Sequence, residues 1–250
     1  MIKNRFGFTL VETLITLGII GVIAGLTLPS AIAGRMSSQA RTQFDTAYAV
    51  LSQAVNDMAA DDITLFGGRY MQKYGSVYEL FKSYMRVSVD CCKYENGKLV
   101  CSISKICAGG GKNGSPNGYE TFSGISGASV NWLIDDGAFV LSNGMLVGFE
   151  NKDTETQYNL VSIDINGKNK PPNRWGWDMF TFQIVGEDLL PVGAMGTSYK
   201  DPAISKNFIF GEDPERWCNS DNSDDKFNGI TCAYKAVNDV DYFKKLYKGH

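Results

Sequence analysis

The chain opens with a long apolar segment that covers residues 8–33. At 1.5 Å per residue, a helix of about 26 residues reaches about 39 Å, which is enough to cross a bilayer core with some tilt. Gly18, Gly21 and Gly25 are small enough to permit close helix contact, and Pro29 predicts a kink because it removes a backbone donor. We therefore predict a membrane-spanning helix over residues 8–33, preceded by a leader at residues 1–7.

The helical period continues over residues 34–60, where the segment becomes amphipathic. Apolar side chains recur at steps of three and four residues, and polar residues occupy much of the other faces. We expect this apolar stripe to pack on the chain's own head domain, residues 61–250. The apolar positions are Ala40, Phe44, Ala47, Tyr48, Leu51, Ala54, Val55 and Met58.

The clearest strand pattern follows in the second half of the chain. Residues 138–141 and 145–149 flank an Asn143-Gly144 pair, which is typical of a hairpin turn. Further strands are predicted at 158–165 and 180–185, an edge strand at 189–191, and a short helix at 78–85. Short links predict an antiparallel meander with one face on the amphipathic helix and the other in solvent. The predicted fold class is therefore α+β.

Composition excludes several kinds of function. The chain has 250 residues, 44% of them hydrophobic, and a net charge of −3, which disfavours broad nucleic-acid binding. Its single histidine, His250, makes histidine-based catalysis improbable, and Asp135-Asp136 has no recognisable nucleophile–base set beside it. The glycine-rich stretch 108–118 lacks the spacing of a phosphate-binding loop and is interpreted as a surface loop. We expect no cofactor and no enzyme.

Six cysteines form a group of four and a later pair: Cys91, Cys92, Cys101, Cys107, Cys218 and Cys232. An even number in an exported chain favours disulfides, whereas the absence of C-x-x-C pairs and of a nearby histidine disfavours zinc. The neighbours Cys91 and Cys92 are expected to take different partners, and the connectivity is otherwise open. The loop between Cys218 and Cys232 is acidic and is either a solvated staple or a contact surface.

Glu12 is the one carboxylate in the apolar segment. A charged side chain near the centre of a membrane helix costs about 2.5–3.5 kcal/mol, so this acid requires a partner, and we expect none within its own segment. Cleavage after Gly7, behind Lys3 and Arg5, would create a new amine on Phe8. An amine from a neighbouring copy at ~4 Å would attract Glu12 by about 4 kcal/mol at an effective dielectric near 20.

The order basic leader, Gly7-Phe8-Thr9-Leu10-Val11-Glu12 and apolar helix resembles the signal of type IV pilins and type II secretion pseudopilins. The resemblance is strong over roughly the first 60 residues. It implies that a prepilin peptidase cuts after Gly7 and methylates Phe8, with Glu12 as the family's acid. It also implies a structural subunit in the inner membrane, assembled with other copies by a platform protein and an ATPase into a periplasmic pseudopilus or surface pilus.

Several alternatives stay open at this point. An ordinary secretory signal would end near Ala31-Ile32-Ala33, although the apolar run is long for that class. The chain could also be a minor pilin, or a filament-mounted adhesin or DNA-uptake module. The particular apparatus is not indicated.

The segment 164–178 resembles a recurrent pilin-type loop, and some relatives bind calcium in head loops. Asp164, Asn166 and Asp178 offer oxygen ligands of the kind that calcium requires. EF-hand spacing is absent, so the favoured interpretation is a loop locked by aspartate-to-backbone hydrogen bonds.

Overall fold

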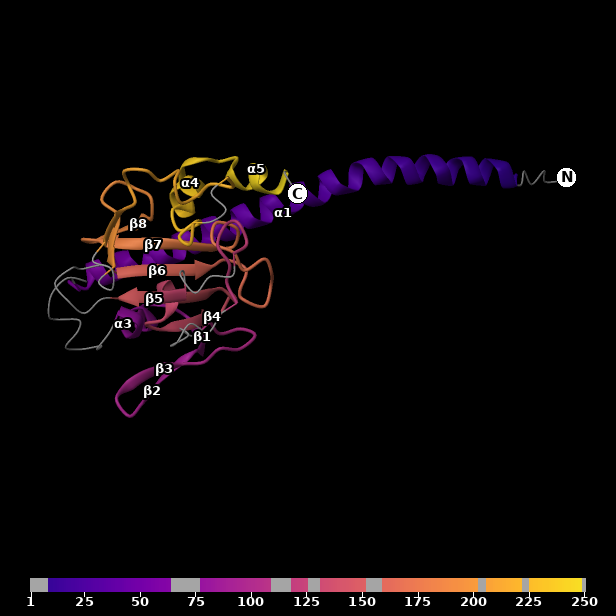
Figure 1. Cartoon of the computed structure of the whole chain (residues 1–250). Helices are drawn as coiled ribbons and strands as arrows, with labels where there is room; N and C mark the ends of the chain where they lie inside the picture. Colours follow the sequence, from indigo (N-terminus) through magenta and orange to yellow (C-terminus); the bar gives the residue numbers. More distant parts are fainter. Residues whose placement is uncertain are drawn as a thin grey trace.

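The computed structural model describes residues 9–63, 77–108, 118–125, 131–151, 159–201, 206–221 and 225–248. Its first element, α1 (Leu10–Ala60), is a continuous 51-residue helix of about 77 Å. Pro29 lies inside it and leaves the Gly25 carbonyl without its helical donor, yet the helix does not break. Figure 1 shows that the first half of α1 projects from the head and that the helix axis changes direction outside the head.

The second half of α1 forms one wall of the hydrophobic core. Phe44 is 1% exposed and packs edge-on against Phe180, with ring centroids 4.7 Å apart. Tyr48 stacks on Phe182 at 5.2 Å. The buried positions match the predicted apolar stripe closely, with Tyr48 only partly buried and Ser37 added: Ser37, Ala40, Phe44, Ala47, Leu51, Ala54, Val55 and Met58.

The sheet that faces α1 has six antiparallel strands in the order β1-β4-β5-β6-β7-β8. The predicted strands and the 189–191 edge strand are present, which confirms the α+β fold. The Asn143-Gly144 turn closes the β4–β5 hairpin, with Gly144 at a φ of +88°. The bounds are β1 (Val87–Asp90), β4 (Ala138–Leu141), β5 (Leu146–Asn151), β6 (Asn159–Asp164), β7 (Met179–Val185) and β8 (Asp188–Pro191).

Several short elements were not predicted. They are the two-stranded ribbon β2 (Cys92–Glu95) with β3 (Lys98–Cys101), the ribbon β9 (Ser198–Asp201) with β10 (Lys206–Ile209), the 3₁₀ turn η1 (Asn131–Ile134), and the terminal helices α4 (Cys232–Asn238) and α5 (Tyr242–Lys248). The predicted helix near residue 80 is present as α3 (Val77–Tyr84). The link between β6 and β7 is also longer than a meander requires, since it spans residues 165–178.

The prediction that the second sheet face meets solvent is wrong. That face carries polar side chains, but they are buried and hydrogen-bonded to the segments that cover them. Trp175 donates its indole N–H to Thr181 Oγ1 at 2.9 Å, and Gln183 exchanges two hydrogen bonds with the backbone of Ser198. The turn η1 approaches so closely that a Cβ on Gly148 would lie 2.5 Å from Ile134 Cγ2. Polar alternation therefore reflects satisfied hydrogen bonds rather than exposure.

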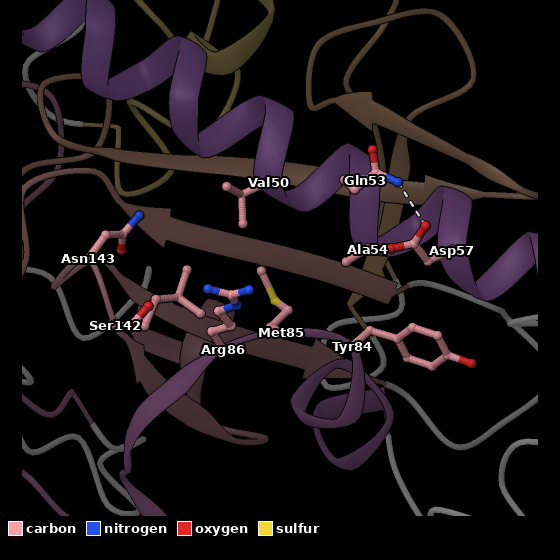
Figure 2. A pocket seen from close by; sticks show the side chains of 10 residues that line it. Val50, Gln53, Ala54, Asp57, Tyr84, Met85, Arg86, Ser142 and Asn143 are labelled. Carbon is pink, nitrogen blue, oxygen red and sulfur yellow. Dashed lines mark hydrogen bonds between the residues drawn. The ribbon is translucent and has the colours of Figure 1, made fainter.

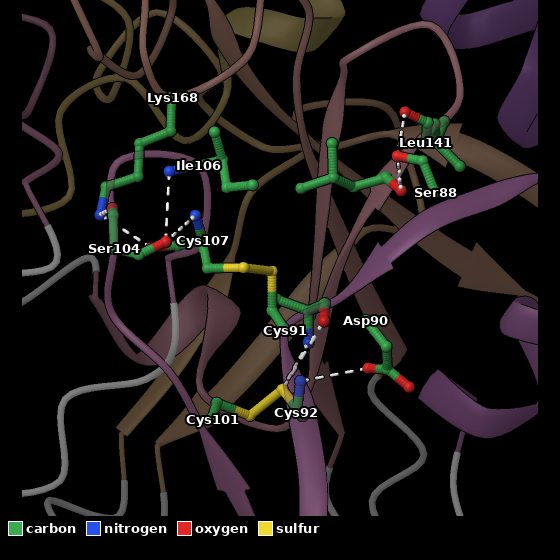
Figure 3. The surroundings of a disulfide bond; sticks show 12 residues. Ser88, Asp90, Cys91, Cys92, Cys101, Ser104, Ile106, Cys107, Leu141 and Lys168 are labelled. Carbon is green, nitrogen blue, oxygen red and sulfur yellow. Dashed lines mark hydrogen bonds between the residues drawn. A yellow bond between two sulfur atoms is a disulfide. The ribbon is translucent and has the colours of Figure 1, made fainter.

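Three disulfides brace the head. Cys91 pairs with Cys107 and Cys92 with Cys101, so the two neighbours hold different loops (Figure 3). Cys218 pairs with Cys232 at the start of α4. The segment before Cys232 is part of the core, since Ile230 and Thr231 are fully buried, whereas Asp221 in the acidic part of the loop is exposed. The described residues contain no free cysteine, and the bonded sulfurs offer no thiolate to zinc.

Candidate membrane and assembly segment

The projecting half of α1 presents an apolar surface all round. Its large side chains are between 47% and 77% exposed, from Met36 to Leu10. Among the described residues, α1 alone is long and apolar enough to cross a membrane, and none of its most apolar stretch is buried. Exposed apolar surface of this extent is typical of a segment that contacts lipid or another protein. Its members are Leu10, Val11, Leu14, Ile15, Leu17, Ile19, Ile20, Val22, Ile23, Leu26, Leu28, Ile32 and Met36.

Three glycines interrupt the large side chains of this segment. Gly18, Gly21 and Gly25 recur at three- and four-residue steps, and a Cβ on any of them would meet no atom within 4 Å. Small residues on one face allow a second helix to approach closely.

Glu12 lies in the first turn of α1, where Thr9 is the N-cap residue. Glu12 Oε2 accepts hydrogen bonds from the Thr9 backbone N–H and from the Thr9 hydroxyl, both at 2.8 Å. The Glu12 N–H donates back to Thr9 Oγ1 at 3.3 Å, which completes a capping box. The expectation that the acid has no partner in its own segment is therefore wrong as regards hydrogen bonds. The pattern of threonine three residues before glutamate was the sequence signal for this contact.

The capping box leaves part of the carboxylate available. Glu12 Oε1 accepts no hydrogen bond from the described residues, and no described cation lies beside it. Gly7 and Phe8, the predicted cleavage pair, lie outside the described residues. The hydrogen bonds of Thr9 belong to residues on the carboxyl side of that pair, so cleavage there would not remove them.

Comparison with known families addresses this same segment. Residues 2–28 match the prokaryotic N-terminal methylation motif, which is the signature of type IV pilin and pseudopilin precursors. This chain carries a prepilin-type signal. No curated protein and no solved structure matches the chain. The prepilin-type signal supports a precursor of the pilin or pseudopilin type, a structural family whose members are usually not enzymes.

The prepilin-type signal also explains why the apolar segment is exposed. The signal fits membrane anchoring before assembly, and it implies processing by a prepilin peptidase and assembly with pilin subunits. Ala31-Ile32-Ala33, the alternative cleavage region, lies inside the continuous helix α1.

In the head, the structure brings Asp164, Asn166 and Asp178 together. Asp164 accepts bonds from Tyr119 Oη at 2.5 Å and from the N–H groups of Asn166 and Gly167. Asp178 accepts from the N–H groups of Asn173 and Arg174 and from the Asn166 side chain. These bonds occupy all four carboxylate oxygens, so a calcium ion would compete with backbone donors. The arrangement is that of a locked loop.

Burial gives these two aspartates unusual acidity. Burial and then the charge of Asp178 raise the pKa of Asp164 to about 7, against the hydrogen bonds that favour its charged form. Burial likewise raises the pKa of Asp178 to about 6. Both carboxyl groups are therefore held in the folded head at a cost in free energy near neutral pH.

The head contains two further features, an acidic cluster and a groove, to which we assign no function. Carboxylate oxygens of Asp135, Asp136 and Glu150 lie within 4.8 Å of one another, and Glu150 also accepts a bond from Tyr199 at 3.5 Å. A groove of about 240 Å³ lies between α1 and the β4–β5 turn. Figure 2 shows Met85 and Arg86 between the α1 side chains and that turn.

Proposed function

We propose that this chain is a structural subunit of a type IV pilus or type II secretion pseudopilus. It is cut after Gly7, methylated at Phe8 and assembled through α1. The observation that carries the proposal is a carboxylate, Glu12, in the first turn of an exposed apolar helix that carries the methylation motif. The proposed role is structural, with no catalytic residue and no cofactor.

The contacts of Glu12 support a pairing between copies. Thr9 satisfies one carboxylate oxygen and fixes the side chain at the start of the helix, where the helix dipole favours negative charge. The other oxygen is available to a cation. A neighbouring copy shifted along its axis could bring its Phe8 amine there, which would set partner and register together. Residues 8–33 would then form the filament core, while residues 34–60 stay on the head.

The partners and places follow from this assembly. The precursor is inserted as a single-pass protein in the inner membrane, and a peptidase removes residues 1–7. A platform protein and an assembly ATPase then move the mature subunit into a periplasmic pseudopilus or a surface pilus.

The test separates the charge of Glu12 from its capping role. Glu12→Gln removes the charge but keeps a side chain that can serve the capping box. We expect inserted and processed protein, with filament yield lowered at least about tenfold because a contact of about 4 kcal/mol is lost. The yield is measured on sheared filaments, and processing by mass spectrometry.

Thr9→Val is the matched variant. It removes the capping hydroxyl, costs the helix start about 1 kcal/mol and leaves the charge in place, so most filaments should remain. Normal filament yield in Glu12→Gln would overturn the pairing. A mature chain that begins at a residue other than Phe8 would overturn the whole proposal.

A second candidate function is a minor, filament-mounted binding subunit. The β2–β3 ribbon projects from the head in Figure 1, and Tyr94 and Val100 on it are 53% and 43% exposed. A low copy number in sheared filaments would favour this candidate. A high copy number would instead indicate a major subunit. A ribbon variant, Tyr94→Ser, should still assemble but lose capture of a ligand that wild-type filaments retain.

A further inference from the structure

A second groove lies where α1 leaves the head, beside the last helix of the chain. Its volume is about 420 Å³. One side belongs to α1 and the other to the carboxyl-terminal half of α5. Its lining includes Leu26, Pro29 and Ser37 of α1 and Lys244, Tyr247 and Lys248 of α5.

The packing of α5 fixes the direction in which it points. At its start, Phe243 contacts Phe44 with ring centroids 5.7 Å apart. At its end, Tyr247 and Lys248 line the groove with α1 residues from Leu26 to Ser37. The helix α5 therefore runs antiparallel to α1, and its last turn points toward the apolar half. Figure 1 shows the end of α5 beside α1 at the edge of the head.

The level of the groove along α1 matches a membrane surface. From Leu10 to Ala33 the helix rises about 35 Å, whereas a bilayer core is about 30 Å thick. If the apolar half spans a bilayer, its last turns before Gly34 reach the headgroup layer. Leu26 and Pro29 then lie at the edge of the core, and Ser37 lies on the water side.

The side chains at this level suit an anionic surface. Lys244 and Lys248 are one turn apart on α5, and the exposed Arg35 lies on α1 at the same end of the head. Asp241 lies 3.7 Å from Lys244, and Asp239 holds Lys245 at 2.6 Å, so those two lysines are partly neutralised. Lys248 and Arg35 have no ion-pair partner among the described residues. Tyr247, packed edge-on against Trp177 at 5.6 Å, adds the aromatic character typical of a membrane interface.

We propose that this groove binds the headgroup of an anionic phospholipid, with Lys244 and Lys248 around the phosphate. Each lysine or arginine near an anionic surface contributes about 1 kcal/mol. Bound lipid would hold the head against the bilayer before assembly and would be left behind when α1 leaves the membrane. The inference rests on the membrane insertion of the proposed function, not on filament formation.

The experiment uses the full chain in nanodiscs of phosphatidylcholine, with and without phosphatidylglycerol. Hydrogen exchange of residues 239–248 is the measurement. We expect exchange to slow about tenfold when phosphatidylglycerol is present and to recover in molar salt, which screens the contact. The variant K244Q/K248Q should lose the lipid dependence and keep the melting temperature.

A matched variant, K98Q/K105Q, removes the same charge from the distant ribbon region and should keep the lipid dependence. Equal exchange in both lipids would overturn the proposal, as would a lipid dependence that survives in K244Q/K248Q. Protection that instead increases with the number of chains per disc would show that the groove holds a second copy. Failure of the chain to enter any disc would count against membrane insertion itself.

Discussion

At the scale of single residues, Asp164 and Asp178 make the stability of the head depend on pH. An unfolded aspartate has a pKa near 3.9, and burial raises both native values above it, that of Asp164 to about 7. Between about pH 4 and pH 7, the folded head therefore binds more protons than the unfolded chain. The free energy of unfolding therefore falls as pH rises through this window, and the stabilising contribution is fully present only below about pH 4.

Asp164→Asn should flatten this dependence. Its amide oxygen can keep the two backbone N–H bonds, and its nitrogen can face Tyr119 Oη. Relative to the wild type, we expect the variant to gain about 1–3 kcal/mol between about pH 5 and pH 8, or roughly 2–12 °C in melting temperature. Thermal unfolding of the full chain in detergent measures it. The exposed Asp188→Asn is the control, and curves that parallel the wild type in both variants would refute the argument.

Residue chemistry was only partly visible in the sequence. The acid at position 12 is conspicuous because a charge is rare in an apolar run. The hydroxyl of Thr9 is not conspicuous, although its spacing from Glu12 is that of a capping box. Asp164 accepts a hydrogen bond from Tyr119, which lies 45 residues away in the sequence. A local sequence pattern cannot predict such a contact.

At the scale of elements, the amphipathic half of α1 is the part that joins rod and head. Phe44 lies against Phe180, Phe182 and Phe243, from one strand and the terminal helix. Because three rings surround it, the site has little freedom to collapse when the ring is removed.

Phe44→Ala should therefore destabilise the head by about 3–5 kcal/mol. Gln39→Ala, at an exposed position of the same helix, should change stability by less than about 0.5 kcal/mol. Urea unfolding followed by tryptophan fluorescence compares the two, since Trp175 is fully buried. Similar midpoints for both variants would show that α1 is not a wall of the core.

The elements found from sequence were those with a strong period or a turn signature. The helix stripe, the Asn143-Gly144 hairpin and the strands beside it were of this kind. The ribbons β2–β3 and β9–β10 and the helices α4 and α5 span only four to seven residues each, too short for periodicity to distinguish them. These short elements form because disulfides and contacts with the sheet hold them, and a local sequence pattern does not encode such contacts.

At the scale of the whole molecule, one helix serves two environments. Its first half is apolar all round and exposed, and its second half is apolar on one stripe and buried in the head. This division was predictable, because it follows from where polar residues first enter the pattern. The cover over the second sheet face was not, because the buried Ser162, Thr181 and Gln183 have the composition of an exposed face.

The second half of α1 meets the last described helix, α5. Arg41 of α1 donates to the carbonyl of Ala236, 195 residues away, and Phe44 lies against Phe243 of α5. In a polypeptide that emerges amino end first, Phe44 would therefore lack its contact with Phe243 until α5 had been synthesised. During synthesis, the apolar stripe of α1 would therefore remain partly exposed until α5 could pack on it. Deletion of α4 and α5 would therefore expose the surface on the second half of α1 that these residues contact.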